Sequence, residues 1–364
     1  MRYSLPKTYI KFCIILSVLF LPIILSSSEL AGYPYLAYSN ETGLMFGGFA
    51  FYKTADPNKE PQPSDINFSI LTNSLYTTKH QFLVAVVPQL QRIDRNWKLD
   101  SSIALKLWPD NYYGLGNFTN ADDAEGYEDR YYEIDSSLQK SLFQSFSYLI
   151  LNSVQGYHQY RKVSPDGQLS DLVLPGKEDS FYSGIGPGLL IDNTDHYQYP
   201  TQGFLFKTSH LVFDKKIGSE YNYSKSLIDL RGYLPLGSST VLAAQTELIS
   251  YRGTVPVYNY LELGNRLRAY DSKRFTERTR IVQRIEQRTF PFRSGVKSRT
   301  GFVVFYEIGQ VSPSIGGIRL KDWHSSYGLG FRFNVLPKER LNLRCDLGFS
   351  SDGVNVIINA RETF

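Results

Sequence analysis

The segment Gly353-Val-Asn-Val-Ile-Ile-Asn-Ala-Arg-Glu-Thr-Phe364 ends the sequence and alternates between polar and apolar side chains. Such a period of two is typical of a β-strand that turns one face to lipid and the other to water. Glu362 and Ile357 are the exceptions to this alternation. Bacterial outer-membrane barrels typically close with a strand that ends on an aromatic residue, so the pattern predicts a barrel strand and makes Phe364 the candidate C-terminal assembly signal. A soluble edge strand could end in the same way.

The N-terminal residues have the layout of an export signal. Three basic residues precede an apolar run at residues 12–25, and serines follow it. We therefore predict that residues 1–28 are a cleaved signal peptide and that residues 29–364 form the mature domain. A helical anchor is the alternative, but an apolar run of this length, interrupted by Pro22, is short for a bilayer span.

The composition also fits a membrane barrel. Hydrophobic residues make up 42% of the chain, the mean hydropathy is -0.26, and Tyr (27) and Phe (23) are abundant. This chain is too polar for a bundle of membrane helices, whereas a barrel alternates lipid-facing with lumen-facing residues and collects aromatic residues at the two interfaces. The net charge of +4 comes without a basic block, which argues against nucleic acid as a partner.

Alternating runs between clusters of turn residues predict an all-β fold, a transmembrane antiparallel β-barrel of about sixteen strands in a single domain. An even number of strands places both chain ends on the same, periplasmic, side. The predicted strands lie at residues 33–39, 43–53, 65–76, 80–91, 96–108, 128–142, 145–161, 179–193, 202–214, 219–234, 239–252, 279–292, 297–310, 324–336, 339–349 and 354–364.

The predicted connections differ in length, as expected if one set is periplasmic and the other extracellular. Short turns lie at residues 40–42, 236–238 and 337–339, and long connections lie at residues 56–64, 111–128, 163–178 and 253–278. Long loops in a compact domain are often functional. The first three long connections are better explained as variable surface decoration, whereas the fourth carries a motif.

This fourth connection reads GTVPVYNYLELGNRLRAYDSKRFTER over residues 253–278. It resembles the long sixth loop of the BamA, TamA and FhaC superfamily of outer-membrane barrels, in which an Arg-Gly-aromatic tripeptide folds back into the lumen. Arg268, Ala269 and Tyr270 occupy the positions of that tripeptide. The resemblance implies that the loop of this chain is folded inward as well.

Further segments extend the resemblance over residues 33–364. A Gly-rich run and a following turn are similar to the family's Gly-rich strand and its D-x-x-D turn with Pro and Gly; the corresponding residues are Gly184, Gly186, Asp192, Asp195, Pro200 and Gly203. The family's last three strands are matched by Gly328-Leu-Gly330-Phe-Arg332, Leu343-Arg344-Cys345-Asp346 and the terminal Phe364. These patterns occur in family order and are together far more specific than any one of them.

The resemblance also implies partners for Arg268. In the family the loop arginine pairs with an acidic residue on the thirteenth strand, supported by one on the twelfth, and Glu307 and Glu286 fall at those positions. A guanidinium inside the lumen needs such partners, because an unpaired buried charge costs several kcal/mol. Ala269 departs from the family's Gly, so a positive φ there would be strained, and Glu307 replaces the more usual Asp. The alternative is that Arg268 is a solvated loop charge.

Assembly and secretion members of this superfamily carry periplasmic POTRA modules before the barrel. Only a few residues separate the predicted signal peptide from the first predicted strand, so we expect a barrel-only member in the outer membrane. One hypothesis is an assembly or translocation barrel that either borrows periplasmic modules from another protein or acts on lipid through a weak seam between its first and last strands. Pro34, in the short first strand at residues 33–39, favours such a seam. The other hypothesis is a passive pore or structural surface protein.

The implied partners follow from this location. They are outer-membrane lipid and lipopolysaccharide, the barrel assembly machinery during biogenesis, and either periplasmic modules or substrate proteins.

The sequence predicts neither an enzyme nor a cofactor. None of the five His lies in an H-E-x-x-H or G-x-S-x-G context, and Asp192, Asp195 and His196 are better explained by a polar turn than by a metal site. After signal cleavage only Cys345 would remain, so neither a disulfide nor a cysteine metal site is expected.

Overall fold

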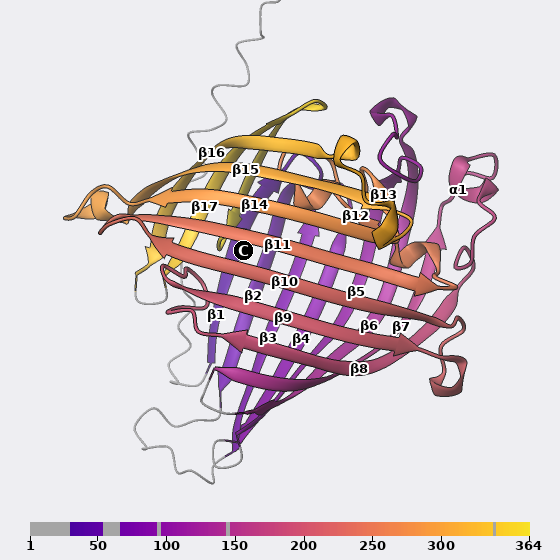
Figure 1. The fold of residues 1–364 in the computed structure, drawn as a ribbon, viewed down its shortest axis with the longest axis horizontal. Helices are drawn as coiled ribbons and strands as arrows, with labels where there is room; N and C mark the ends of the chain where they lie inside the picture. Colours follow the sequence, from indigo (N-terminus) through magenta and orange to yellow (C-terminus); the bar gives the residue numbers. More distant parts are fainter. Residues whose placement is uncertain (1–29, 54–65, 93–95, 143–145, 338–339) are drawn as a thin grey trace, which may run out of the picture.

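Alternating side chains produce one sheet that closes on itself (Figure 1). The computed structural model describes residues 30–53, 66–92, 96–142, 146–337 and 340–364. Sixteen antiparallel strands form the barrel, and β18 (Gly353–Ala360) returns to pair with β1 (Leu30–Ser39). The predicted all-β fold and number of strands are confirmed. The predicted signal peptide lies outside the described residues and stays a prediction.

The remaining barrel strands follow one another along the chain. They are β2 (Gly43–Lys53), β3 (Ile66–Thr77), β4 (Phe82–Arg92), β5 (Trp97–Tyr112), β6 (Glu125–Ser141), β7 (Ser147–Arg161), β8 (Ser180–Asp192), β9 (Gly203–Phe213), β10 (Tyr223–Pro235), β11 (Thr240–Gly253), β14 (Thr279–Thr289), β15 (Thr300–Ser312), β16 (His324–Leu336) and β17 (Leu341–Ser350). The two-residue strands β12 (Leu261–Glu262) and β13 (Thr276–Glu277) pair with each other inside the longest loop.

Helical segments in the described residues are short and lie in the connections. They are α1 (Gln168–Asp171), η1 (Ala121–Asp123), η2 (Lys215–Ile217), η3 (Val257–Asn259), η4 (Gly264–Arg266), η5 (Val296–Arg299), η6 (Ile315–Gly317) and η7 (Leu320–Asp322). In the described ranges no helix has the length and apolar character needed to cross a bilayer.

Strand β15 shows how the two faces of the sheet differ. Phe302, Val304 and Tyr306 are 48–55% exposed on the outer face, whereas Phe305 and Glu307 are buried on the inner face. A bilayer accommodates an apolar outer face, and an inner face that carries charge needs water or charged partners. The sheet therefore suits a membrane on its outside and a polar lumen on its inside.

The connections do not sort by length as cleanly as the sequence predicts. The end of the barrel opposite the chain termini, called the loop end below, carries the long connections at 113–124, 162–179 and 254–278. The short turn at 40–42 lies at the loop end too, so that part of the prediction is wrong. The turn at 236–239 lies at the other end, called the terminal end. The predicted long connection at 56–64 lies outside the described residues.

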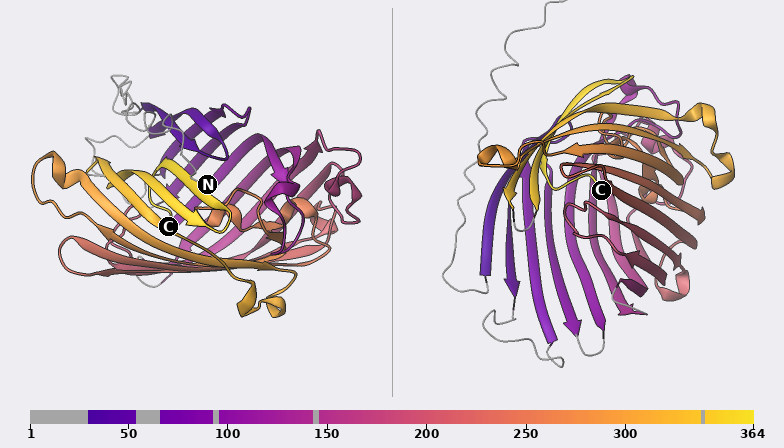
Figure 2. Two further views of the ribbon diagram at one scale, coloured as in Figure 1. Left: turned by 90° about the horizontal axis from the view of Figure 1, so that it is seen from above. Right: turned by 60° about the vertical axis from the view of Figure 1, so that its left-hand side comes forward.

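The joint between the first and last strands, called the seam below, is much narrower than the others (Figure 2). Only Tyr38 and Ser39 of β1 pair with residues of β18, whereas β1 pairs with β2 through ten residues. The weak pairing is as predicted, but the predicted short first strand is wrong, since β1 starts at Leu30. The two strands are offset, because the last residue of β1, Ser39, pairs with Ile357 in the middle of β18.

We predict that the folded chain migrates faster on a gel when it is left unheated than after boiling, and that it fractionates with the outer membrane. In a closed sheet most strands are paired with both neighbours, so the barrel should stay compact in detergent until it is heated. Gel electrophoresis of paired heated and unheated samples tests this expectation. Recovery of the chain as a soluble periplasmic protein would contradict it.

Candidate functional site in the lumen

The connection between β11 and β14 folds into the barrel, as the sequence resemblance implies. A buried apolar cluster joins it to the wall and consists of Leu263, Leu267, Tyr270 and Phe275 of the loop, Val282 of β14 and Val311 of β15. The loop also closes on itself, because a Cβ added at Gly264 would stand 1.7 Å from the carbonyl oxygen of Asp271. Only glycine permits that approach. This packing places Arg268 among the strands.

Arg268 is 4% exposed and contacts carboxylates on three strands. Its Nε donates to Glu307 of β15 at 2.8 Å and its Nη2 to Glu286 of β14 at 2.5 Å. Its Nη1 donates to Asp346 of β17 at 3.1 Å, and its backbone N–H donates to the second oxygen of Glu307 at 2.7 Å. The guanidinium carbon lies 3.4 Å from the centre of the Phe305 ring. Arg268 is therefore a buried and paired charge, not a solvated one.

The structure brings together the partners that the resemblance implies and adds one. Glu286 and Glu307 both bind Arg268, but Asp346 was not predicted as a partner, although it lies in a segment that resembles the family. A signal was present: Asp346 sits at an inner-face position of a strand whose neighbours Cys345 and Leu347 point outward. The alternation identifies the face, but it does not show which residues meet across the lumen.

The Ala269 departure causes no strain. Ala269 is not among the described residues with positive φ. A Cβ added at Gly348 of β17 would stand 3.2 Å from the Ala269 methyl group, so the glycine makes room for it. The carbonyl of Ala269 accepts a hydrogen bond from Ser350 at 3.0 Å, and the Tyr270 hydroxyl donates to the carbonyl of Ser325 at 3.2 Å. The tripeptide docks with alanine in the central position.

Further arginines surround this site. Arg288 Nε donates to Glu286 at 2.8 Å. Arg332 and Arg344 both donate to Asp346, at 2.5 and 3.2 Å. Glu286 and Asp346 thus each serve Arg268 and at least one strand arginine, which makes the loop and the wall parts of one ion-pair network.

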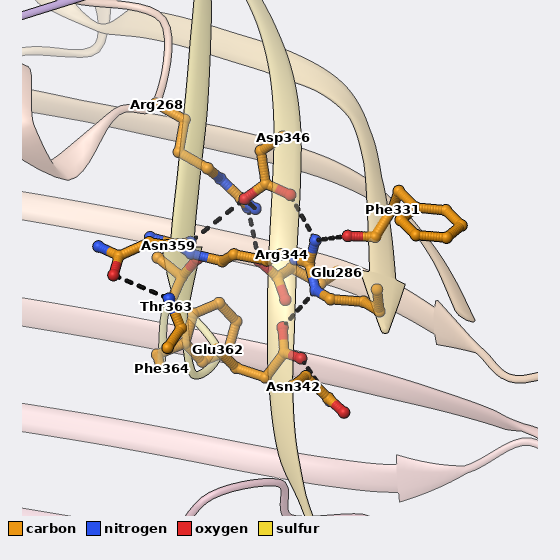
Figure 3. Close-up of polar contacts among 12 residues, drawn as sticks. Arg268, Glu286, Phe331, Asn342, Arg344, Asp346, Asn359, Glu362, Thr363 and Phe364 are labelled. Atoms are coloured by element: carbon orange, nitrogen blue, oxygen red, sulfur yellow. Dashed lines mark hydrogen bonds and ion pairs between the residues drawn. The ribbon is translucent and has the colours of Figure 1, made fainter. Parts of the chain in front are cut away.

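The last residues of the chain leave the sheet and enter the same network (Figure 3). Arg361 has a positive φ of 69°, which turns the chain inward after β18. Glu362 accepts a hydrogen bond from Arg332 Nε at 2.8 Å, and Thr363 accepts one from Arg344. The predicted closing strand at residues 354–364 is therefore too long, since β18 ends at Ala360. The charge of Glu362, which interrupted the apolar face in the sequence, was the signal for this turn.

Phe364 itself is buried in the lumen wall. It is 7% exposed and packs with Tyr233, Val241 and Ala243 of β10 and β11. Its backbone oxygen accepts a hydrogen bond from Arg288 Nη2 at 3.0 Å, and the Arg288 guanidinium lies 5.0 Å from the ring centre. Through Arg288 the chain end shares the carboxylate of Glu286 with the loop.

The predicted D-x-x-D turn joins β8 to β9 at the terminal end. Asp192 accepts hydrogen bonds from Thr194, and Asp195 accepts them from Thr201 at 2.7 Å and from Arg340 at 2.6 Å. Arg340 precedes β17, which is remote from β8 in the strand order, so the turn reaches across the barrel end. Burial opposes ionisation of Asp195, but the hydrogen bonds from Arg340 and Thr201 outweigh it and lower the pKa of Asp195 below its usual value.

The motif glycines of β8 lie farther from the turn and allow close contact with β9. A Cβ added at Gly186 would stand 1.8 Å from the carbonyl oxygen of His210 on β9, and one at Gly184 would stand 2.6 Å from the Phe213 ring. Pro200 is buried, and Gly203 has a φ of 101°. These residues fit the turn and its strands together. Over the described ranges no group of three side chains could hold a metal ion.

A buried pair beneath the loop was not predicted from the sequence. His158 Nε2 lies 2.5 Å from Asp129 Oδ1, and the two residues are 4% and 7% exposed. The His158 ring stacks on loop residue Tyr258 with ring centres 4.2 Å apart. Because the loop covers the pair, we interpret it as packing between the loop and strands β6 and β7, not as a catalytic group.

Comparison with models of protein families identifies one family that matches the chain. The model of the Omp85 superfamily domain matches residues 77–350, which is more than half of the chain. The chain belongs to the Omp85 superfamily. The resemblance drawn from its loop and strand motifs is confirmed, and with it an integral outer-membrane location. A search of curated proteins found no match.

Solved structures share the barrel at low sequence identity. BamA from Haemophilus ducreyi lacking POTRA domains 1–3 aligns with a TM-score of 0.64 and 13% identity, over 92% of this chain and 70% of that one. CdiB from Escherichia coli gives 0.59 and 9%, over 92% and 63%, and CdiB from Acinetobacter baumannii gives 0.56 and 9%, over 92% and 59%. The chain thus spans less than two thirds of the CdiB chains. At identities this low, the structural alignments establish the shared fold alone.

We predict that Arg268→Ala destabilises the barrel by about 3–5 kcal/mol, because it leaves three buried carboxylates without their common cation. A solvated pair would contribute about 1 kcal/mol or less. The compact gel band of Arg268→Ala should therefore be lost at a lower temperature than that of the wild type, and Glu307→Ala should behave similarly. The double variant should be less than additive, since both changes remove one interaction.

Arg266→Ala is the matched control for this series. Arg266 lies on the same loop, but its side chain is 39% exposed and stands 3.7 Å from Glu247. Its replacement should leave the transition temperature nearly unchanged. Equal effects of Arg266→Ala and Arg268→Ala, or simple additivity of the Arg268 and Glu307 variants, would contradict the assignment of a buried lock.

Proposed function

We propose that this Omp85 barrel assists the insertion or translocation of proteins at the outer membrane, and that it acts at the seam between β1 and β18. The observation that carries the proposal is the narrow joint, with two residue pairs against ten between β1 and β2. Residues 30–37 of β1 have no partner in β18, although they pair fully with β2.

An unpaired strand edge offers backbone donors and acceptors that a further strand can pair with. At the seam this edge belongs to a sheet that spans the membrane. A client strand added to β1 would therefore enter the bilayer with its backbone groups satisfied, which is the main requirement for inserting a strand into lipid. The seam can admit such a strand because few hydrogen bonds must be broken.

In this proposal the ion-pair network around Arg268 stabilises the part of the wall that does not open. Arg268 links β14, β15 and β17 through Glu286, Glu307 and Asp346. These strands belong to the run from β14 to β17 that leads to β18, so the lock would keep this wall fixed while β1 and β18 separate. Loss of the lock should loosen the wall, and seam opening would then no longer be confined to one joint.

The partners expected from the sequence belong to this proposal. Before folding, Phe364 would serve as the signal that the barrel assembly machinery reads. The folded barrel would meet outer-membrane lipid and lipopolysaccharide on its outer face. Client proteins, with or without periplasmic modules of another protein, would approach from the terminal end.

The alternative function is a passive pore or a structural surface protein. A polar cavity of about 600 Å³ at the loop end, lined by Glu41, Asp110 and Tyr127 among others, favours it. A passive pore should conduct ions steadily in a planar bilayer in its wild-type form. The proposed function instead expects low conductance, because the loop occupies the lumen, and a rise in conductance in Arg268→Ala.

We predict that a disulfide across the seam abolishes assisted assembly. In a Cys345→Ser background, Tyr38→Cys and Ile358→Cys place thiols at directly opposed positions on β1 and β18. Oxidation would covalently close the edge that the proposal requires to be free. The measurement is the folding of a denatured client barrel into proteoliposomes, followed by the gel shift of the client, with reduction restoring the activity.

A second cysteine pair controls for the effect of the cross-link itself. Phe206→Cys and Leu230→Cys are opposed on β9 and β10, away from the seam. This pair should leave assisted assembly unchanged when it is oxidised. An oxidised seam variant that stays as active as its reduced form would end the proposal.

A further inference from the structure

The polar cavity of about 600 Å³ at the loop end is separate from the ion-pair network around Arg268, since it shares no lining residue with that network. It is lined by the β1–β2 and β3–β4 turns, by the adjoining ends of β5 and β6, and by Asp271 and Ser272 of the inward loop. Pockets for small molecules commonly have volumes of about 300–1,000 Å³. The cavity is therefore large enough to hold a small organic molecule.

Carboxylates outnumber ammonium groups on the lining of this cavity. The carboxylates belong to Glu41, Asp110, Glu128 and Asp271, and the ammonium groups belong to Lys79 and Lys162. Glu128 is paired with Lys162 at 2.9 Å, and Nζ of Lys79 donates to the carbonyl oxygen of Asn40 at 2.7 Å. Within the described ranges neither Glu41 nor Asp110 forms an ion pair. Two such carboxylates in one cavity attract a cation from solution.

Tyr127 of β6 is a second indication of a ligand. Its side chain is 6% exposed and lines the cavity, and its hydroxyl has no hydrogen-bond partner among the described residues. The hydroxyl of a buried tyrosine usually has such a partner. Edge-to-face packing on Tyr160, with ring centres 5.3 Å apart, holds the Tyr127 ring in place. A donor group of a bound molecule would satisfy the hydroxyl oxygen.

The lining suits an organic cation better than a metal ion. Across the part of the chain that the structure describes, no three Asp, Glu, His or Cys side chains are grouped in a way that could hold a metal ion. An ammonium group donates three hydrogen bonds and is attracted to aromatic ring faces. Tyr113 and Tyr127 bring aromatic rings to the same lining as the two carboxylates.

We propose that this cavity is a binding site for a small organic diamine. Its ammonium groups are held by the carboxylates of Glu41 and Asp110, with the hydroxyl of Tyr127 as a further acceptor. The bound molecule joins the β1–β2 turn, which carries Glu41, to the inward loop, which carries Asp271. The site does not rest on the proposed function, because neither a client protein nor the opening of the seam is needed to fill it.

The test titrates the folded chain with putrescine in micelles of an uncharged detergent at low ionic strength, and isothermal titration calorimetry measures the binding. The butanediol of the same length is the neutral probe. Putrescine should bind at one site per chain, and the diol should bind at least about tenfold more weakly, because hydrogen bonds to charged groups are the stronger ones. Equal binding of the diol, or displacement of putrescine by an equal concentration of calcium chloride, would overturn the proposal.

Variants of the full chain locate the site. Glu41→Gln and Asp110→Asn should each weaken putrescine binding about tenfold, and Tyr127→Phe should weaken it about threefold, since a neutral hydrogen bond contributes less than a charged one. Asp122→Asn is the matched control, because Asp122 is exposed on a loop-end connection but does not line the cavity. The gel shift shows which variants are folded, and Glu41→Gln carries the test if Asp110→Asn does not fold. Unchanged binding in folded Glu41→Gln, or an equal loss in Asp122→Asn, would reject the site.

The affinity for putrescine should also rise from about pH 6 to about pH 8. Burial and the carboxylates of Asp110 and Glu262 raise the pKa of Glu41 to about 7. Lys106 and a hydrogen bond to Ser272 oppose this rise without cancelling it. Glu41 therefore gains its negative charge across this range, while putrescine keeps both of its positive charges. Glu41→Gln should reduce the pH dependence, and a wild-type affinity that does not rise with pH would contradict the role of Glu41.

Discussion

The rest of the lumen depends on one buried cation. Arg268 is 4% exposed and is held by Glu286, Glu307 and Asp346. Removing a guanidinium from water is costly, and several carboxylates in good geometry are needed to offset that cost. Each carboxylate comes from a different strand, so the charge can be satisfied only when the loop and three strands are in place together. The ion pairs thus select one arrangement of loop and wall.

The ion-pair network also includes the last residues of the chain, and it makes one part of the barrel wall more strongly connected than the seam. Glu286 and Asp346 are shared with Arg288 and Arg332, which bind Phe364 and Glu362. Strands β14 to β17 are therefore joined by side-chain ion pairs in addition to their hydrogen-bond ladders. Beyond them, two residue pairs connect β18 to β1. A force that opens the barrel would be expected to part the sheet at that joint first, because it has the fewest bonds to break.

The sequence predicts the parts of the structure that depend on neighbouring residues. Period-two alternation identifies all sixteen strands, and the family resemblance identifies Arg268 with two of its partners. Alternation does not identify Asp346 as the third partner, because contacts across the lumen depend on the register of many strands. It also misplaces Phe364, since a single turn at Arg361 reverses which face the following residues occupy. The charged Glu362, on an otherwise apolar face, was the sequence feature that indicated an earlier end of the strand.

A buried network of arginines and carboxylates fills the lumen at a large cost in desolvation free energy. Apolar side chains of similar volume would often be as stable, because ion pairs lose the solvation of both partners. Apolar packing, however, does not distinguish one occupant from another, whereas Arg288 and Arg332 require oxygen atoms at fixed positions. The cost of the network is thus offset by the specificity with which it positions the loop and the last residues of the chain.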